Sequence, residues 1–175
     1  RLYWPHQIKI SAQLDDLAQL KQDQLLYWRV AGNQQQISVL AELSVEQCSK
    51  LIVNADIYQQ LSAIQQVAIS TIHLKQSQLM ALKPGDLSIG KRYIAACHDL
   101  ASMQQAQQIG CDAILLSPVL PTATHPDAVA LGWEQFKAWV SQIDIPVFAL
   151  GGMQAGDLAT AKEQGAYGIA GMRFL

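Results

Sequence analysis

Residues 145–175 read IPVFALGGMQAGDLATAKEQGAYGIAGMRFL, and this stretch is the most informative part of the chain about its fold. An apolar run ends at Gly151 and Gly152, an amphipathic pattern then stops at Gly165, and a second apolar run carries Gly171. Short apolar runs bounded by glycine predict buried strands, and the amphipathic spacing between them predicts a helix. The stretch therefore predicts one strand–helix–strand unit of a parallel sheet.

The two glycine-bearing strand ends also predict a binding site for a phosphate group. Glycine has no Cβ, so the backbone N–H groups beside it can approach oxyanions closely. In (βα)8 barrels, the loops after the seventh and eighth strands often form such a site. The predicted phosphate-binding residues are Gly151, Gly152, Gly171, Met172 and Arg173. A tight turn without a ligand is the alternative explanation of the glycine pair.

The rest of the chain repeats the same unit. Apolar segments predict strands at residues 7–11, 25–31, 51–53, 68–74, 92–97, 113–119 and 145–150, and from 167 onward. Helical spacing predicts helices at residues 12–22, 37–50, 57–64, 76–82, 100–108, 132–143 and 153–165. Residues 117–131 contain three prolines and predict a long irregular loop. We expect a compact α/β fold, a (βα)8 TIM barrel that lacks its last helix, with one flank either uncovered or covered by another domain or subunit.

Composition narrows the class of protein. The 175 residues are half apolar with a formal charge of −2, which suits a single domain and argues against non-specific binding of nucleic acid. No apolar run reaches the roughly 20 residues that a membrane span needs. Three cysteines without regular spacing argue against a disulfide framework, so we expect a cytoplasmic protein. The opening RLYWPHQIKI has no initiator methionine, so we expect a piece of a longer polypeptide.

Five pieces of the chain, in their order and spacing, resemble the thiamine phosphate synthase/TenI superfamily. They are CHD at 97–99, SPVLPTATHPD at 117–127, LGWEQF at 131–136, IPVFALGGM at 145–153 and GAYGIAGMRFL at 165–175. The resemblance implies a TIM barrel that acts in thiamine biosynthesis or salvage. Related domains also occur fused behind Nudix hydrolases, which implies a covalently linked Nudix domain as a candidate partner.

In that superfamily, the synthase joins a pyrimidine pyrophosphate to a thiazole phosphate, and TenI-type relatives isomerise the thiazole product. Pyrophosphate leaves with the help of Mg²⁺, because its developing charge must be neutralised by a metal held on carboxylates and by lysine or arginine. The resemblance therefore implies a phosphorylated heterocycle as the ligand and Mg²⁺ as the cofactor. A homo-oligomer is left open.

The positions that hold the metal in the superfamily lack their carboxylates in this chain. The Asn-Asp pair after the third strand falls on Asn54 and Ala55, which leaves Asp56, one residue later, as the candidate metal ligand. The pattern His-x-Gly-Gln-x-Asp after the fourth strand falls on His73, Lys75, Gln76 and Gln78. Hard cations need charged oxygen ligands, so these departures predict weak binding of Mg²⁺.

The other motifs supply candidate catalytic and substrate-binding residues. The pattern Gln-x-Arg-x-Lys at the second strand keeps only its arginine, and the lysine of Thr-x-Thr-Lys after the sixth strand is replaced by His125, which can titrate. The resemblance implies catalytic roles for Arg29, Thr122, Thr124 and His125. It implies substrate binding by Asn54, Gln76, His98 and Ser117.

Structural roles are open for several of these residues. Arg29 is expected to be buried at a strand end, where its charge needs either a ligand anion or a carboxylate such as Asp56. His73 lies in an apolar strand and is expected to be a hydrogen-bonded core histidine. His98 is expected to help cap the next helix, with ligand binding as the alternative, and residues 122–125 are explained equally well as a loop with no catalytic role.

Two functions are therefore consistent with the sequence. The first is a thiamine phosphate synthase/TenI-like domain that binds a phosphorylated thiazole or thiamine phosphate. The alternative is a degenerate, non-catalytic module that binds a phosphorylated metabolite or docks on a partner such as a Nudix domain. Whether the chain is an enzyme depends on the missing carboxylates, because catalysis by the superfamily's route needs the metal that they hold.

Overall fold

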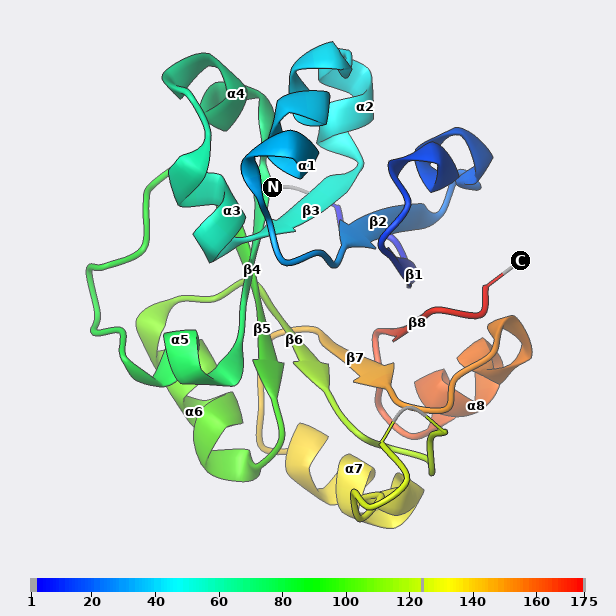
Figure 1. The fold of residues 1–175 in the computed structure, drawn as a ribbon. Coiled ribbons are helices and arrows are strands. Elements are labelled where there is room, and N and C mark those ends of the chain that lie inside the picture. The colour runs from blue at the N-terminus through cyan, green and yellow to red at the C-terminus, as the bar shows by residue number, and fades with distance from the viewer. Residues whose placement is uncertain (1–2, 124, 175) are drawn as a thin grey trace.

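The computed structural model describes residues 3–123 and 125–174, and its strands form one closed parallel barrel (Figure 1). Each strand pairs with the next in chain order, and β8 pairs with β1 to close the barrel. The strands are β1 Gln7–Ser11, β2 Gln24–Trp28, β3 Leu51–Asn54, β4 Thr71–Leu74, β5 Arg92–Cys97, β6 Ala113–Leu116, β7 Val147–Leu150 and β8 Gly168–Gly171. The predicted (βα)8 barrel is confirmed.

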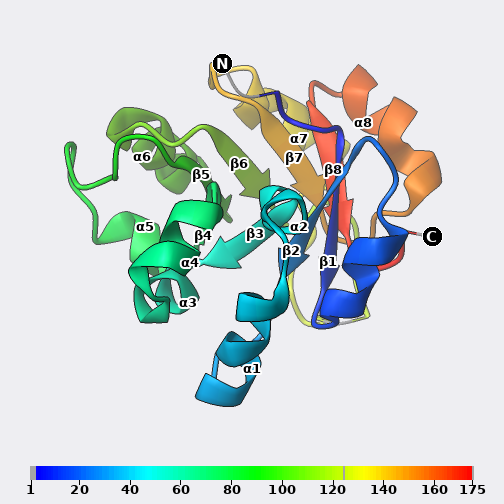
Figure 2. The same ribbon diagram turned by 90° about the horizontal axis from the view of Figure 1, so that it is seen from above.

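The helices lie outside the barrel, between consecutive strands (Figure 2). The α-helices are α1 Gln34–Val39, α2 Val45–Ser49, α3 Ala55–Gln60, α4 Ala63–Ala68, α5 Gln76–Met80, α6 Leu100–Ile109, α7 Gly132–Val140 and α8 Leu158–Glu163. Short 3₁₀ helices are η1 Leu14–Gln19, η2 Leu40–Glu42 and η3 Ala155–Asp157. Within the described residues no helix follows β8, as the sequence predicted, and no helix is long and apolar enough to cross a membrane.

Several predicted helices have different bounds because capping side chains restart them. The predicted helix 37–50 is wrong as a single element: α1 begins earlier, after Asn33, and a capping box of Ser44 and Gln47 starts α2. The predicted helix 57–64 ends early, because Ser62 accepts the backbone N–H of Gln65 and begins α4. Side-chain capping of this kind satisfies backbone donors that a new helix leaves unpaired. The predicted helix 12–22 is the shorter η1.

Several predicted strands are too long, including the strand predicted at 145–150, which begins only at Val147, and the strand predicted from 167 onward, which is Gly168–Gly171. The strand predicted at 25–31 stops at Trp28, where its ladder with β1 ends opposite Ser11. The strand predicted at 113–119 stops at Leu116, and the strand predicted at 68–74 begins only at Thr71. Strands of this barrel pair over only a few residues, so apolar sequence continues beyond the hydrogen-bonded ladder. Residues after the carboxyl ends, including Arg29 and Ser117, therefore lie in loops.

The apolar core has an inner and an outer layer. Alternate strand residues fill the barrel interior, which contains Ile8, Ile10, Ile52, Leu115 and Phe148. The opposite faces pack against the surrounding helices in two further clusters, around Phe136 and around Leu26. This alternation follows from the period of two in a strand, which sends neighbouring side chains to opposite faces.

The outward face of β1 is polar. Its outward residues Gln7, Lys9 and Ser11 are half-buried, and Asp16 of η1 lies over them. The Asp16 carboxylate accepts a hydrogen bond from Ser11 Oγ at 2.6 Å and lies 3.8 Å from Lys9 Nζ. A polar flank can face water, so this side of the barrel does not require another domain or subunit to cover it.

Candidate functional site

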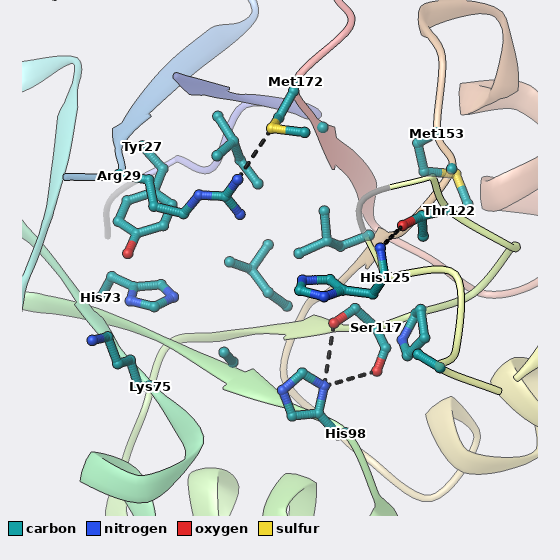
Figure 3. A pocket seen from close by; sticks show the side chains of 18 of the residues that line it. Tyr27, Arg29, His73, Lys75, His98, Ser117, Thr122, His125, Met153 and Met172 are labelled. Atoms are coloured by element: carbon teal, nitrogen blue, oxygen red, sulfur yellow. Dashed lines mark hydrogen bonds between the residues drawn. The ribbon is translucent and has the colours of Figure 1, made fainter. Parts of the chain in front are cut away.

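A cavity of about 1080 Å³ opens at the carboxyl ends of the strands, the end at which (βα)8 barrels carry their active sites (Figure 3). Every strand or the loop after it contributes at least one lining residue. The predicted site residues that line it are Arg29, Asn54, Asp56, His98, Ser117, Thr122, His125, Gly152, Gly171, Met172 and Arg173. Gly151 and Gln76 do not line it, and Thr124 lies outside the described residues. The roles of these residues stay predictions.

The glycines after β7 let the loop that follows β6 pack directly on the backbone. Gly151 has φ 110° and Gly152 has φ 69°, a region that side chains disfavour. A Cβ on Gly151 would lie 2.9 Å from Pro118 Cα, and a Cβ on Gly152 would lie 2.8 Å from Pro121 O. Close packing thus requires both glycines, whether or not a ligand is bound. Only Gly152 is exposed and reaches the cavity.

The backbone after β7 and the backbone after β8 lie side by side, as the predicted phosphate site requires. β7 pairs with β8, and beyond them Gln154 forms an isolated parallel bridge with Arg173. Gly171 lies against Met153, whose carbonyl oxygen would be 3.3 Å from an added Cβ. This corner therefore combines exposed backbone from two loops with the cationic side chain of Arg173, which suits an oxyanion.

Arg29 is exposed, so the prediction that it is buried is wrong. The residue comes directly after the last residue of β2, and although its backbone N–H still donates to Ser11 O of β1 at 2.9 Å, its side chain lies in the solvent-exposed rim. Its Nη2 donates to Met172 Sδ at 3.1 Å, which joins the loop after β2 to the loop after β8 on one side of the cavity (Figure 3). Among residues 3–123 and 125–174 the weak sulfur acceptor of Met172 is the hydrogen-bond partner of this guanidinium, which therefore retains most of its capacity to bind an anion.

A buried polar network stands on the floor of the cavity at β3 and β4. His73 is 5% exposed, and its ring stacks on that of Tyr27 with centroids 4.2 Å apart. Asn54 Nδ2 lies 3.2 Å from His73 Nδ1 and 3.0 Å from Gln78 Oε1, while Gln78 Nε2 donates to Asn54 Oδ1 at 3.2 Å. The prediction of a hydrogen-bonded core histidine is confirmed, although His73 also lines the cavity.

Because His73 is buried, we expect it to make the folded protein less stable at acidic pH. Desolvation, aided by the charges of Lys75 and Arg29, lowers the pKa of His73 from 6.5 to about 3. The unfolded chain therefore binds a proton that the folded chain does not, and stability is lost as the pH falls below 6.5. When the pH is lowered from 7.5 to 5, this histidine alone should reduce the free energy of unfolding by about 2 kcal/mol. Urea unfolding at the two pH values measures it.

The matched control is His73→Phe, which retains a ring against Tyr27 but cannot titrate. The variant should lose less stability than the unmodified chain over the same pH interval. Equal losses in the two proteins would contradict the assignment to His73.

His98 is fixed by its neighbours at the end of β5. Its Nδ1 lies 3.0 Å from the carbonyl oxygen of Ser117 and 3.3 Å from Ser117 Oγ, and its backbone N–H donates to Gln76 Oε1 at 2.7 Å. A carbonyl oxygen only accepts, so Nδ1 carries the proton and Nε2 is the acceptor in the neutral ring. Gln76 therefore holds the His98 backbone rather than lining the cavity. The helix cap at this point is the neighbouring Asp99, which accepts from Ser102 N at 2.8 Å.

The cavity wall is cationic. Among the described lining residues, Arg29, Lys75 and Arg173 carry fixed positive charges and Asp56 is the carboxylate. The sequence interpretation did not assign Lys75 to the site. Its position directly after β4 was the available signal, because residues at the carboxyl ends of barrel strands face the ligand. Net positive charge in a chain of net charge −2 favours an anionic ligand.

Fold and cavity together define a (βα)8 barrel protein with a cationic ligand cavity at the carboxyl ends of its strands. The family model for thiamine monophosphate synthase matches residues 13–175. The chain belongs to this family, and the resemblance inferred from the sequence motifs is confirmed.

Individual relatives agree with this assignment. The chain is 39% identical over 77 residues to a putative thiamine-phosphate synthase 2 of Aquifex aeolicus, covering 44% of this chain and 41% of the relative. It is 30% identical over 125 residues to the thiamine-phosphate synthase of Fusobacterium nucleatum, covering 71% and 61%. The matches thus span about half the length of these curated relatives.

Solved structures share the fold. A thiamine phosphate pyrophosphorylase from Pyrococcus furiosus has a TM-score of 0.64 at 18% identity, with 94% of this chain and 83% of that chain covered. FabK from Thermotoga maritima has a TM-score of 0.70 at 16% identity, with 95% and 58% covered. Identities this low show the common barrel and nothing about the ligand.

Proposed function

We propose that the cavity binds thiazole phosphate or thiamine phosphate, as part of thiamine biosynthesis or salvage. The observation that supports this most directly is the excess of fixed cations over carboxylates around a cavity that ends at the loops after β7 and β8. In this proposal the backbone beside Gly152 and Arg173 binds the phosphate, and the heterocycle lies over the apolar part of the wall. The names of the relatives support a ligand of the thiamine pathway.

Calorimetry with thiamine phosphate tests the proposal, and unphosphorylated thiamine is the matched ligand. The phosphate ester should bind at least about tenfold more tightly than thiamine, because the charge-assisted contacts are made only to the phosphate. Equal affinities, or no binding of either compound, would reject a phosphate site in this cavity.

A second candidate is binding without catalysis, and the Asn54–Gln78 pair favours it. The family pattern implies one metal-binding carboxylate directly after Asn54 and another at the position of Gln78. In this chain the neutral side-chain amides of Asn54 and Gln78 bond to each other instead. An assay with the pyrimidine pyrophosphate, thiazole phosphate and Mg²⁺ separates the candidates. Thiamine phosphate formed at ordinary enzyme rates would exclude the non-catalytic function. A linked Nudix domain, a homo-oligomer and a cytoplasmic location stay predictions.

A further inference from the structure

The side chains at the β3–β4 corner of the cavity do not suit Mg²⁺. Asp56 is the carboxylate among the described lining residues, and within residues 3–123 and 125–174 no group of three or more His, Cys, Asp or Glu could hold a metal ion. Asn54 Oδ1 already accepts from Asp56 N at 3.0 Å and from Gln78 Nε2 at 3.2 Å. Mg²⁺ is usually held by one or two carboxylates together with its ligand's oxygens, so a single exposed carboxylate is a weak anchor.

Positive side chains stand beside this corner instead. Arg29 follows β2 and Lys75 follows β4, and both line the cavity on the two sides of β3. Figure 3 shows Arg29, His73 and Lys75 along one wall, opposite Thr122 and His125. Tyr27 and His73 come two residues before Arg29 and Lys75, and their rings stack with centroids 4.2 Å apart, so the ends of β2 and β4 present both cations to the same part of the cavity.

We propose that this wall binds the diphosphate group of a ligand without a divalent metal ion, with Lys75 and Arg29 supplying the positive charge. The inference goes beyond the proposed function, whose ligands carry a single phosphate bound beside Gly152 and Arg173, and adds a second anion site on the opposite wall of the same cavity. The Arg29 guanidinium has a planar fork of donors, and the Lys75 ammonium is exposed on a flexible stem, so the two can contact different oxygens of one anion.

The uncharged side chains at the β3–β4 corner also favour binding of the metal-free anion over binding of its Mg²⁺ complex. The Asn54–Gln78 amide pair adds no negative charge, and His73 stays neutral because its pKa is lowered to about 3. A metal-bound diphosphate carries less negative charge than the free anion, and its metal would be repelled by the two cations. Excess Mg²⁺ should therefore weaken binding rather than strengthen it.

Calorimetric titration of inorganic diphosphate into the protein tests this inference, once in EDTA and once in excess MgCl₂. Binding should occur in EDTA and should be weaker in MgCl₂. Lys75→Met should weaken the EDTA affinity about tenfold, Lys75→Arg should retain most of it, and Lys137→Met, an exposed lysine on α7, should leave it unchanged. Binding that appears only with Mg²⁺, or equal affinities of Lys75→Met and the unmodified chain, would overturn the inference.

Thiamine phosphate titrated in parallel separates this inference from the proposed function. If diphosphate binds in EDTA but thiamine phosphate does not bind, the proposed function fails and the metal-free anion site stands. If thiamine phosphate binds but diphosphate requires Mg²⁺, the metal-free site fails and the proposed function stands.

Discussion

Gly152→Asp should weaken the binding of thiamine phosphate at least about 100-fold, which corresponds to about 2.7 kcal/mol. The aspartate places a negative charge beside the proposed phosphate, where the backbone and Arg173 otherwise present positive charge. Its Cβ would also lie 2.8 Å from Pro121 O and 3.0 Å from Leu120 Cβ, at a φ of 69°. The substitution therefore acts through both charge and the position of the β6 loop. Calorimetry measures the affinity.

Two controls separate these effects. Gly152→Ala has the same backbone conflict without the charge and should retain more affinity than Gly152→Asp. Gly156→Asp adds the same charge at an exposed glycine with nothing within 4 Å of an added Cβ, so it should bind nearly as well as the unmodified chain. If Gly152→Asp is folded, as its circular dichroism spectrum would show, and binds with unchanged affinity, the phosphate does not bind at this loop.

The barrel was predictable because each of its units carries local signals that agree. The predicted helix 100–108 is present as α6, with Asp99 as its N-cap and the left-handed Gly110 at its end, residue types that are typical of these two positions. The glycine pair after β7 likewise marked a loop at the carboxyl end of the sheet. Such signals depend on neighbouring residues only, so a single sequence contains them.

Some strand ends, helix bounds and site residues were not predicted correctly from the sequence, and each error has a physical explanation. An apolar run does not show where the ladder with the neighbouring strand stops, so Arg29 was assigned to a strand that ends one residue before it. Ser62 and Gln65 form a capping box three residues apart, a local signal that the predicted helix 57–64 did not use. Lys75 directly follows β4, which is a second local signal that the sequence interpretation left unused. The end of β2 at Trp28, by contrast, is set by contacts between segments distant in the chain.

Gly168→Ala should lower the free energy of unfolding by about 3 kcal/mol or more, because no space exists for even one methyl group. Gly168 is the first residue of β8 and lies where β8 meets β1 to close the barrel. An added Cβ would overlap the carbonyl oxygen of His6, which also accepts the backbone N–H of Ile169 at 2.9 Å. The same Cβ would lie 2.8 Å from Phe148 Cε2 in the barrel interior.

The alanine can be accommodated only if β1 moves away from β8 or Phe148 moves within the inner core. Either movement weakens the contact that closes the barrel, so the loss should appear as a lower urea midpoint of the whole transition. Gly156→Ala is the matched control and should change the unfolding free energy by less than about 0.5 kcal/mol, since its added methyl meets open space. A Gly168→Ala variant as stable as this control would mean that β1 and β8 are farther apart than described, and that the barrel closes less tightly there.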